Sequence, residues 1–154
     1  MVIGSSNVSV DNKGRIFVPA KWRESYSQKL VAMYGLTEEP DERFLLVMPY
    51  EYFEKFVDEI NSPRPIDLKL NNAARNILQN AYECEIDAKG RILLDKSLLD
   101  HARITSSATL TATRNNCFEV WEPERLNAKN LAYTQLDSAR DLQKLADEQE
   151  RMGR

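Results

Sequence analysis

The sequence contains few residues of the kinds that build metal centres, disulfides and acid–base catalytic sites. Its 154 residues include two cysteines, Cys84 and Cys117, and one histidine, His101. The cysteines lie in apolar, strand-like contexts without Cys-x-x-Cys spacing, so we expect two buried thiols rather than a disulfide or a metal site. The histidine has no ligand or catalytic companion near it, and we expect no metal and no other cofactor.

Long apolar runs are also missing. No stretch approaches the roughly 18 residues that a transmembrane helix needs, and residues 1–10 have no basic segment followed by a long apolar one. We therefore expect a cytoplasmic protein. A Walker-type glycine loop and a nucleophile–base pair are absent. Glu83 and Glu85 alternate along a predicted strand and should share one solvated face, so the sequence does not indicate an enzyme.

Positive charge is in deficit overall but is unevenly distributed. The net charge is −3, which argues against a uniformly basic nucleic-acid binder. Residues 1–30 carry five basic and two acidic residues, whereas residues 36–60 carry two basic and eight acidic ones. Such a chain can present one face to phosphate and turn the other away. Chance clustering on a solvated surface is the alternative.

An internal repeat divides the chain into two similar halves. Residues 10–16, Val-Asp-Asn-Lys-Gly-Arg-Ile, recur 76 positions later at residues 86–92 as Ile-Asp-Ala-Lys-Gly-Arg-Ile. Residues 47–53 and 120–126 are also similar, at an offset of 73. A unit of half this chain is too small to bury a core alone. We therefore expect the two units to interleave around one shared core.

Each half is expected to contain short strands and helices. The Asp-x-Lys-Gly-Arg segments are turn signatures, because Asp accepts hydrogen bonds from nearby backbone N–H groups and Gly adopts positive φ. Residues 16–18 are β-branched and aromatic, which predicts a buried strand. Pro19 suits the first turn of a short helix. The remaining predicted strands are residues 8–10, 29–33, 43–48, 82–86, 91–94, 109–113 and 117–121.

Helices account for much of the remaining chain. Residues 49–60 are amphipathic at helical spacing, and residues 68–80 should form a helix that connects the halves. Residues 61–65 are rich in turn formers and predict a loop. The tail from residue 126 onward predicts one terminal helix that frays. The expected organisation is a first repeat (1–60), a connecting loop and helix (61–80), a second repeat (81–126) and a C-terminal helical tail (127–154).

The two turns carry the candidate nucleic-acid contacts. Lys13 and Arg15 in one turn, and Lys89 and Arg91 in the other, would lie at hairpin loops that pseudo-symmetry brings to one face. Arginine can hold a phosphate or the edge of a guanine with two parallel hydrogen bonds, and lysine adds a point charge toward phosphate. The short helix after the first turn adds two further candidate DNA contacts, Lys21 and Arg23.

Four further residues are expected to organise these turns. Gly14 and Gly90 let the backbone pass close to a duplex, whereas Asp11 and Asp87 are poor DNA contacts that hold the turn or orient the arginine. The alternative is that both turns only fold the hairpin, with Asp and Arg paired internally.

The Asp-x-Lys-Gly-Arg hairpin, an apolar triplet, Pro19 and a short helix with Trp22 and Arg23 together resemble the MraZ family. That family belongs to the AbrB/SpoVT group of swapped-hairpin DNA binders, and the resemblance covers about residues 1–126. It implies an α+β, mainly β fold, in which two tandem swapped-hairpin AbrB-like units form a pseudo-twofold barrel with short helices.

Membership would also imply a function. The expected protein is a nucleoid-associated transcriptional regulator that binds repeated operator elements in double-stranded DNA and assembles into a ring-shaped homo-oligomer. The expected target is the division and cell-wall gene cluster including its own gene, with repression as the expected sign. The alternative is a non-enzymatic protein-interaction module or antitoxin-like oligomeric scaffold, whose binding would be much less sensitive to salt.

The second repeat departs from the family pattern. Asp95 stands where a proline is expected, and Leu98 and Leu99 replace Trp22 and Arg23. Because basic residues are fewer there, the first repeat is expected to contribute more of the DNA contact.

Overall fold

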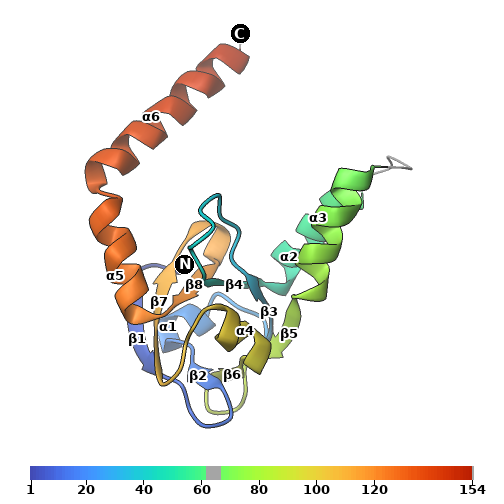
Figure 1. Cartoon of the computed structure of the whole chain (residues 1–154), viewed down its shortest axis with the longest axis vertical. Helices are drawn as coiled ribbons and strands as arrows, with labels where there is room; N and C mark the ends of the chain where they lie inside the picture. Colours follow the sequence, from blue (N-terminus) through green and yellow to red (C-terminus); the bar gives the residue numbers. More distant parts are fainter. Residues whose placement is uncertain (62–66, 154) are drawn as a thin grey trace. The chain divides into compact units, whose positions relative to one another are not determined.

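A computed structural model describes residues 1–61 and 67–153, so the predicted loop at residues 61–65 lies outside the described residues except for Asn61. The chain divides into two compact units, residues 1–123 and 124–154. The elements of the first unit (Figure 1) are, in chain order, β1 (Ser5–Ser9), β2 (Arg15–Phe17), α1 (Ala20–Arg23), β3 (Lys29–Tyr34), β4 (Leu45–Pro49), α2 (Tyr50–Ile60), α3 (Leu68–Gln79), β5 (Tyr82–Glu85), β6 (Arg91–Leu93), α4 (Lys96–His101), β7 (Ser107–Ala112), the 3-10 helix η1 (Arg114–Asn116) and β8 (Phe118–Trp121).

The strands of the first unit are arranged with internal pseudo-twofold symmetry. Six of them form an open antiparallel sheet in the order β1-β7-β8-β4-β3-β5, and β2 pairs with β6 in a separate two-stranded ribbon. When each strand is exchanged with its counterpart in the other half, the order of the sheet is simply reversed. The halves interleave, because β1 pairs with β7 and β5 pairs with β3. The predicted α+β, mainly β fold is confirmed.

The shared core lies between the ribbon and one face of the sheet. Ile16 and Ile92 are partners across the ribbon and are 0% and 1% exposed. They belong to the same buried cluster as Leu30, Leu110 and Phe118 of the sheet. Burying one such side chain stabilises the fold by about 1.5–3 kcal/mol. Because both halves supply these residues, neither half has this core without the other.

Helices cover the opposite face of the sheet over β3 and β4. Val31 and Met33 alternate along β3 with core residues and belong to a second buried cluster, against which Tyr50 and Phe53 of α2 and Ile77 of α3 pack. Strand alternation therefore places α2 and the ribbon on opposite faces of the sheet. This separation puts the acidic α2 on the side away from the two turns.

Details of the first unit differ from the sequence-based expectations. The strand β1 begins at Ser5, earlier than predicted, because it is an edge strand whose polar residues 5–7 carry no hydrophobic signal. The segment at residues 16–18 is buried only at Ile16 and Val18, whereas Phe17 is 53% exposed. The prediction of a wholly buried strand was therefore wrong, because the ribbon packs on the core through one face only.

The second unit contains two helices where one was predicted. These are α5 (Pro123–Ala132) and α6 (Gln135–Met152). Thr134 has extended backbone angles. Its hydroxyl accepts a hydrogen bond from the Asp137 N–H, and the Asp137 carboxylate accepts one from the Thr134 N–H. This capping box fixes the start of α6 and interrupts what periodicity alone presents as a continuous helix.

Candidate nucleic-acid interface

The first turn is organised by the carboxylate of Asp11. It accepts hydrogen bonds from the backbone N–H groups of Lys13 and Arg15, each at 2.9 Å, and from Nε of Arg15 at 2.6 Å. The backbone N–H of Arg15 contributes most to lowering the pKa of Asp11 to about 2, so this carboxylate is ionised at neutral pH. Asp11 thus shapes the turn and orients the arginine at the same time.

The second turn repeats this arrangement. Asp87 accepts from the backbone N–H groups of Lys89 and Arg91 at 2.9 Å and from Nε of Arg91 at 3.0 Å. Hydrogen bonding, led by the Arg91 N–H, lowers the pKa of Asp87 as well. Both turns have a glycine at positive φ, +87° at residue 14 and +88° at residue 90, where a side chain would be strained.

The ribbon brings the two turns side by side. The carbonyl oxygen of Gly90 accepts a hydrogen bond from the Val18 N–H, and that of Gly14 accepts one from the Leu94 N–H, both at 2.9 Å. Each turn is therefore bonded to the strand of the other half. Nη1 of Arg91 lies 4.0 Å from the Asp11 carboxylate of the opposite turn. The structure therefore places these arginines and carboxylates in one cluster, although they come from segments 76 residues apart.

The arginines of the cluster are oriented but still reach solvent. The side chains of Arg15 and Arg91 are 30% and 18% exposed. The bond from Nε to the aspartate uses one of the five N–H donors of each guanidinium and leaves donors on the Nη atoms for a ligand. Lys13 and Lys89 are exposed at the tips of the turns. The arrangement can therefore offer directed hydrogen bonds from arginine and mobile charge from lysine to one anionic ligand.

The two basic residues of α1 have different surroundings. Lys21 is exposed. Arg23 instead extends over the second turn, where a Cβ added to Gly90 would lie 1.9 Å from its Nη1. Its Nε is buried and has no hydrogen-bond partner among the described residues. The side chain of Arg23 therefore packs on the second turn, whereas Lys21 faces solvent.

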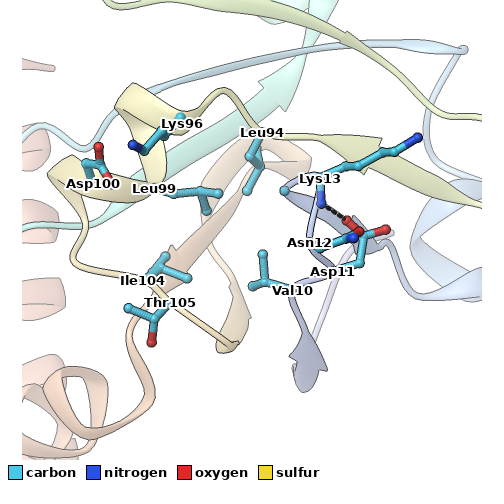
Figure 2. Close-up of a pocket in the computed structure, with 11 residues that line it drawn as sticks. Val10, Asp11, Asn12, Lys13, Leu94, Lys96, Leu99, Asp100, Ile104 and Thr105 are labelled. Carbon is cyan, nitrogen blue, oxygen red and sulfur yellow. Dashed lines mark hydrogen bonds between the residues drawn. The ribbon is translucent and has the colours of Figure 1, made fainter.

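Beside the first turn, a shorter side chain takes the place of Arg23. Leu99, the counterpart of Arg23 at the 76-residue offset, lies over Gly14. A pocket of about 410 Å³ remains there, with Val10, Leu94 and Ile104 among its lining residues. Figure 2 shows these apolar side chains facing a common space, while the side chain of Lys13 points away from it. The two turns thus have the same hydrogen bonds but pack against different side chains, Arg23 at the second turn and Leu99 at the first.

The outer face of the ribbon carries two exposed apolar side chains that our sequence-based reasoning missed. Phe17 is 53% exposed and Leu93 is 56% exposed. The guanidinium carbon of Arg91 lies 6.0 Å from the centre of the Phe17 ring, within cation–π range. The runs Ile16-Phe17-Val18 and Ile92-Leu93-Leu94 are apolar at every position, so their hydrophobicity does not show which side chain faces outward.

The cysteines and the histidine lie elsewhere. Cys84 and Cys117 are free and buried, as predicted, and burial raises the pKa of each thiol to about 11. His101 stacks on Tyr34 with ring centres 3.6 Å apart. Among residues 1–61 and 67–153, no group of His, Cys, Asp and Glu side chains is arranged to hold a metal ion. Over the same residues, no helix is both long and apolar enough to cross a bilayer.

Comparison with known proteins places this arrangement in one family. The family model described as "MraZ protein, putative antitoxin-like" matches residues 1–67 and 77–148. A transcriptional regulator MraZ from Lachnoclostridium phytofermentans is 30% identical over 92% of this chain and 94% of its own length. The one from Haemophilus influenzae is 31% identical over 79% of this chain and 80% of its own length. The one from Nitrosospira multiformis is 32% identical over 82% of this chain and 85% of its own length. The chain belongs to the MraZ family.

Proposed function

We propose that the protein is a DNA-binding transcriptional regulator that contacts DNA through the face formed by its two Asp-x-Lys-Gly-Arg turns. The observation that carries this proposal is the pairing of β2 with β6, which sets both turns beside each other with each arginine held by an aspartate. Relatives over most of the chain are named transcriptional regulators. In this proposal residues 1–60 and 81–126 are the two repeats, joined by residues 61–80 and followed by the tail at 127–154.

Each turn residue has a distinct part in the contact. Arg15 and Arg91 are oriented for paired hydrogen bonds to a phosphate or a guanine edge, because aspartate fixes their Nε atoms. Lys13 and Lys89 supply charge toward phosphate. A negatively charged carboxylate beside the duplex is tolerated because it accepts hydrogen bonds from three N–H groups of its own turn.

Further basic residues support this face unequally. The exposed Lys21 belongs to the first repeat, and its counterpart in the second repeat is Ser97. Arg23 acts through the second turn, on which it packs. The acidic α2 lies on the other face of the sheet, so the net negative charge of the chain does not oppose the approach of DNA on the ribbon side.

One chain presents only a few cations to DNA, so a single copy should bind weakly. We propose a ring-shaped homo-oligomer that engages several operator repeats at once, because linked contacts raise avidity without any new interaction. The proposed target is the DNA upstream of the protein's own gene in a division and cell-wall gene cluster, which the bound protein represses. A protein held as a monomer that bound such an operator with undiminished affinity would contradict this mechanism.

The experiment is an anisotropy titration of duplex DNA from upstream of the gene, at 50 mM and 200 mM salt. We expect salt-sensitive binding by the wild type and loss of binding by Arg15→Ala/Arg91→Ala. The matched control is Lys55→Ala/Lys69→Ala, which removes the same charge from exposed positions on α2 and α3. Absence of wild-type binding at low salt, or equal losses in both double variants, would refute the proposal.

The two arginines are not expected to contribute equally. The first repeat carries Lys21 and Arg23 where the second carries Ser97 and Leu99, so Arg15→Ala should weaken binding more than Arg91→Ala. The same titration on the single variants tests this, and equal losses would show that the second turn contributes as much as the first.

A further inference from the structure

The outer face of the β2–β6 ribbon has a composition that neither folding nor charge explains. In the register of the ribbon, Arg15 lies opposite Leu93 and Phe17 lies opposite Arg91. Directly paired residues of an antiparallel ribbon point to the same side. The four side chains thus form one face, with the arginines on one diagonal and two large, more than half-exposed apolar side chains on the other.

We propose that Phe17 and Leu93 contact thymine methyl groups and so contribute to the sequence specificity of DNA binding. This inference rests on the proposed function and assigns base recognition to the ribbon itself. The major groove of B-DNA is about 12 Å wide and admits a two-stranded ribbon. The strands of such a ribbon lie about 4.8 Å apart, so both can enter the groove together.

The chemistry of the face matches that of the groove floor. Arginine pairs with the acceptor atoms O6 and N7 of guanine, whereas the thymine methyl is an apolar group in the same groove. Phe17 and Leu93 are held beside the oriented arginines, one by direct pairing with Arg91 and the other with Arg15. Their side chains therefore project from the same face of the ribbon as the guanidinium groups and would meet bases next to those that the arginines contact.

Charge favours DNA over a second copy of the chain as the occupant of this face. Each turn carries one Asp, one Lys and one Arg and is therefore net positive. Two copies meeting through their ribbons would bring positively charged turns together, and like charges oppose such contacts. DNA supplies negative phosphates at both rims of the groove and apolar methyl groups on its floor. The alternation of cationic and apolar side chains on the ribbon is complementary to that pattern.

The test compares the upstream duplex with the same duplex in which every thymine is replaced by deoxyuridine, a change that removes only the methyl groups. Burial of one methyl group corresponds to about fourfold in Kd. We expect the wild type to bind the uracil duplex about fourfold more weakly for each methyl contacted. The variant Phe17→Ala/Leu93→Ala should bind both duplexes equally, with an unchanged salt dependence. Because both side chains are largely exposed, this variant should retain the wild-type melting temperature and sedimentation coefficient.

The outcomes separate this inference from the proposed function. Salt-sensitive binding that is the same on thymine and uracil duplexes would overturn the role of Phe17 and Leu93 and leave DNA binding by the turns intact. A Phe17→Ala/Leu93→Ala variant that still distinguishes the two duplexes would also overturn it. A smaller sedimentation coefficient for that variant would assign the apolar pair to a contact between copies instead. Absence of salt-sensitive binding to either duplex would reject the proposed function, and this inference with it.

Discussion

Gly90→Ala is expected to destabilise the protein through two separable effects. The positive φ at this position costs a residue with a Cβ about 1–2 kcal/mol. The new Cβ would also lie 1.9 Å from Nη1 of Arg23, so the guanidinium must move, and overpacking of this kind costs about 1–3 kcal/mol. We expect a total loss of about 2–5 kcal/mol in the free energy of unfolding.

A double-mutant cycle separates the two effects. In an Arg23→Ala background only the backbone strain remains, so Gly90→Ala should cost about 1–2 kcal/mol there. Gly14→Ala is the matched control, because its Cβ would meet the backbone oxygen of Leu94 at 2.7 Å, and this obstacle cannot be removed by shortening a side chain. Leu99→Ala should therefore not rescue Gly14→Ala to the same extent.

The assay is urea unfolding at pH 7 and one fixed protein concentration, because self-association shifts apparent stability. Comparison of transition midpoints at an unchanged m-value gives the coupling energy. If Gly90→Ala costs the same with and without Arg23, the packing of Arg23 on the second turn is not a source of stability. The structural difference between the two turns would then have no energetic consequence.

Three further predictions concern other parts of the molecule. Phe118→Ala should lower the free energy of unfolding by about 3–5 kcal/mol in urea titrations, because this ring is fully buried in the shared core; a loss below 1 kcal/mol would contradict the packing. Burial lowers the pKa of His101, so the unfolded chain takes up this proton first as the pH falls. The free energy of unfolding should therefore decrease below about pH 6.5. His101→Phe, which keeps a ring on Tyr34, should remove this part of the pH dependence. An unchanged pH dependence in that variant would contradict the prediction. Cys84 and Cys117, whose pKa values are raised by burial, should react with a thiol reagent at pH 8 in 8 M urea but much more slowly in the folded protein; equally fast labelling of the native protein would show that the thiols are accessible.

The repeated motif predicted most of the fold. Asp, Gly and Arg at fixed offsets indicate a turn by local chemistry, and a second copy at half the chain length indicates interleaving, because neither half can bury a core alone. Local patterns could not predict what depends on the partner strand. The exposure of Phe17 follows from the ribbon having only one buried face, and the polar start of β1 becomes a strand only because β7 supplies its hydrogen bonds.

The candidate site was predictable in its residues but not in their division of roles. The pairing of Asp11 with Arg15 spans four residues and could be read from the motif. The position of Arg23 could not, because its guanidinium lies over a glycine 67 positions away that belongs to the other half. Phe17 and Leu93 could not be recognised as a pair for the same reason, since they come to share one face only when β2 and β6 of the two halves pair. Contacts across the pseudo-twofold axis are the part that sequence alone leaves open.

The most direct measurement of the central claim is the slope of log Kd against log salt for the upstream duplex, with the wild type and Lys13→Ala/Lys89→Ala. Each phosphate contact contributes about 0.9 to this slope. If both exposed turn lysines contact phosphate, the double variant should bind more weakly and its slope should be shallower by about 1.8. A double variant with the slope and affinity of the wild type would show that DNA does not approach the protein at these two turns.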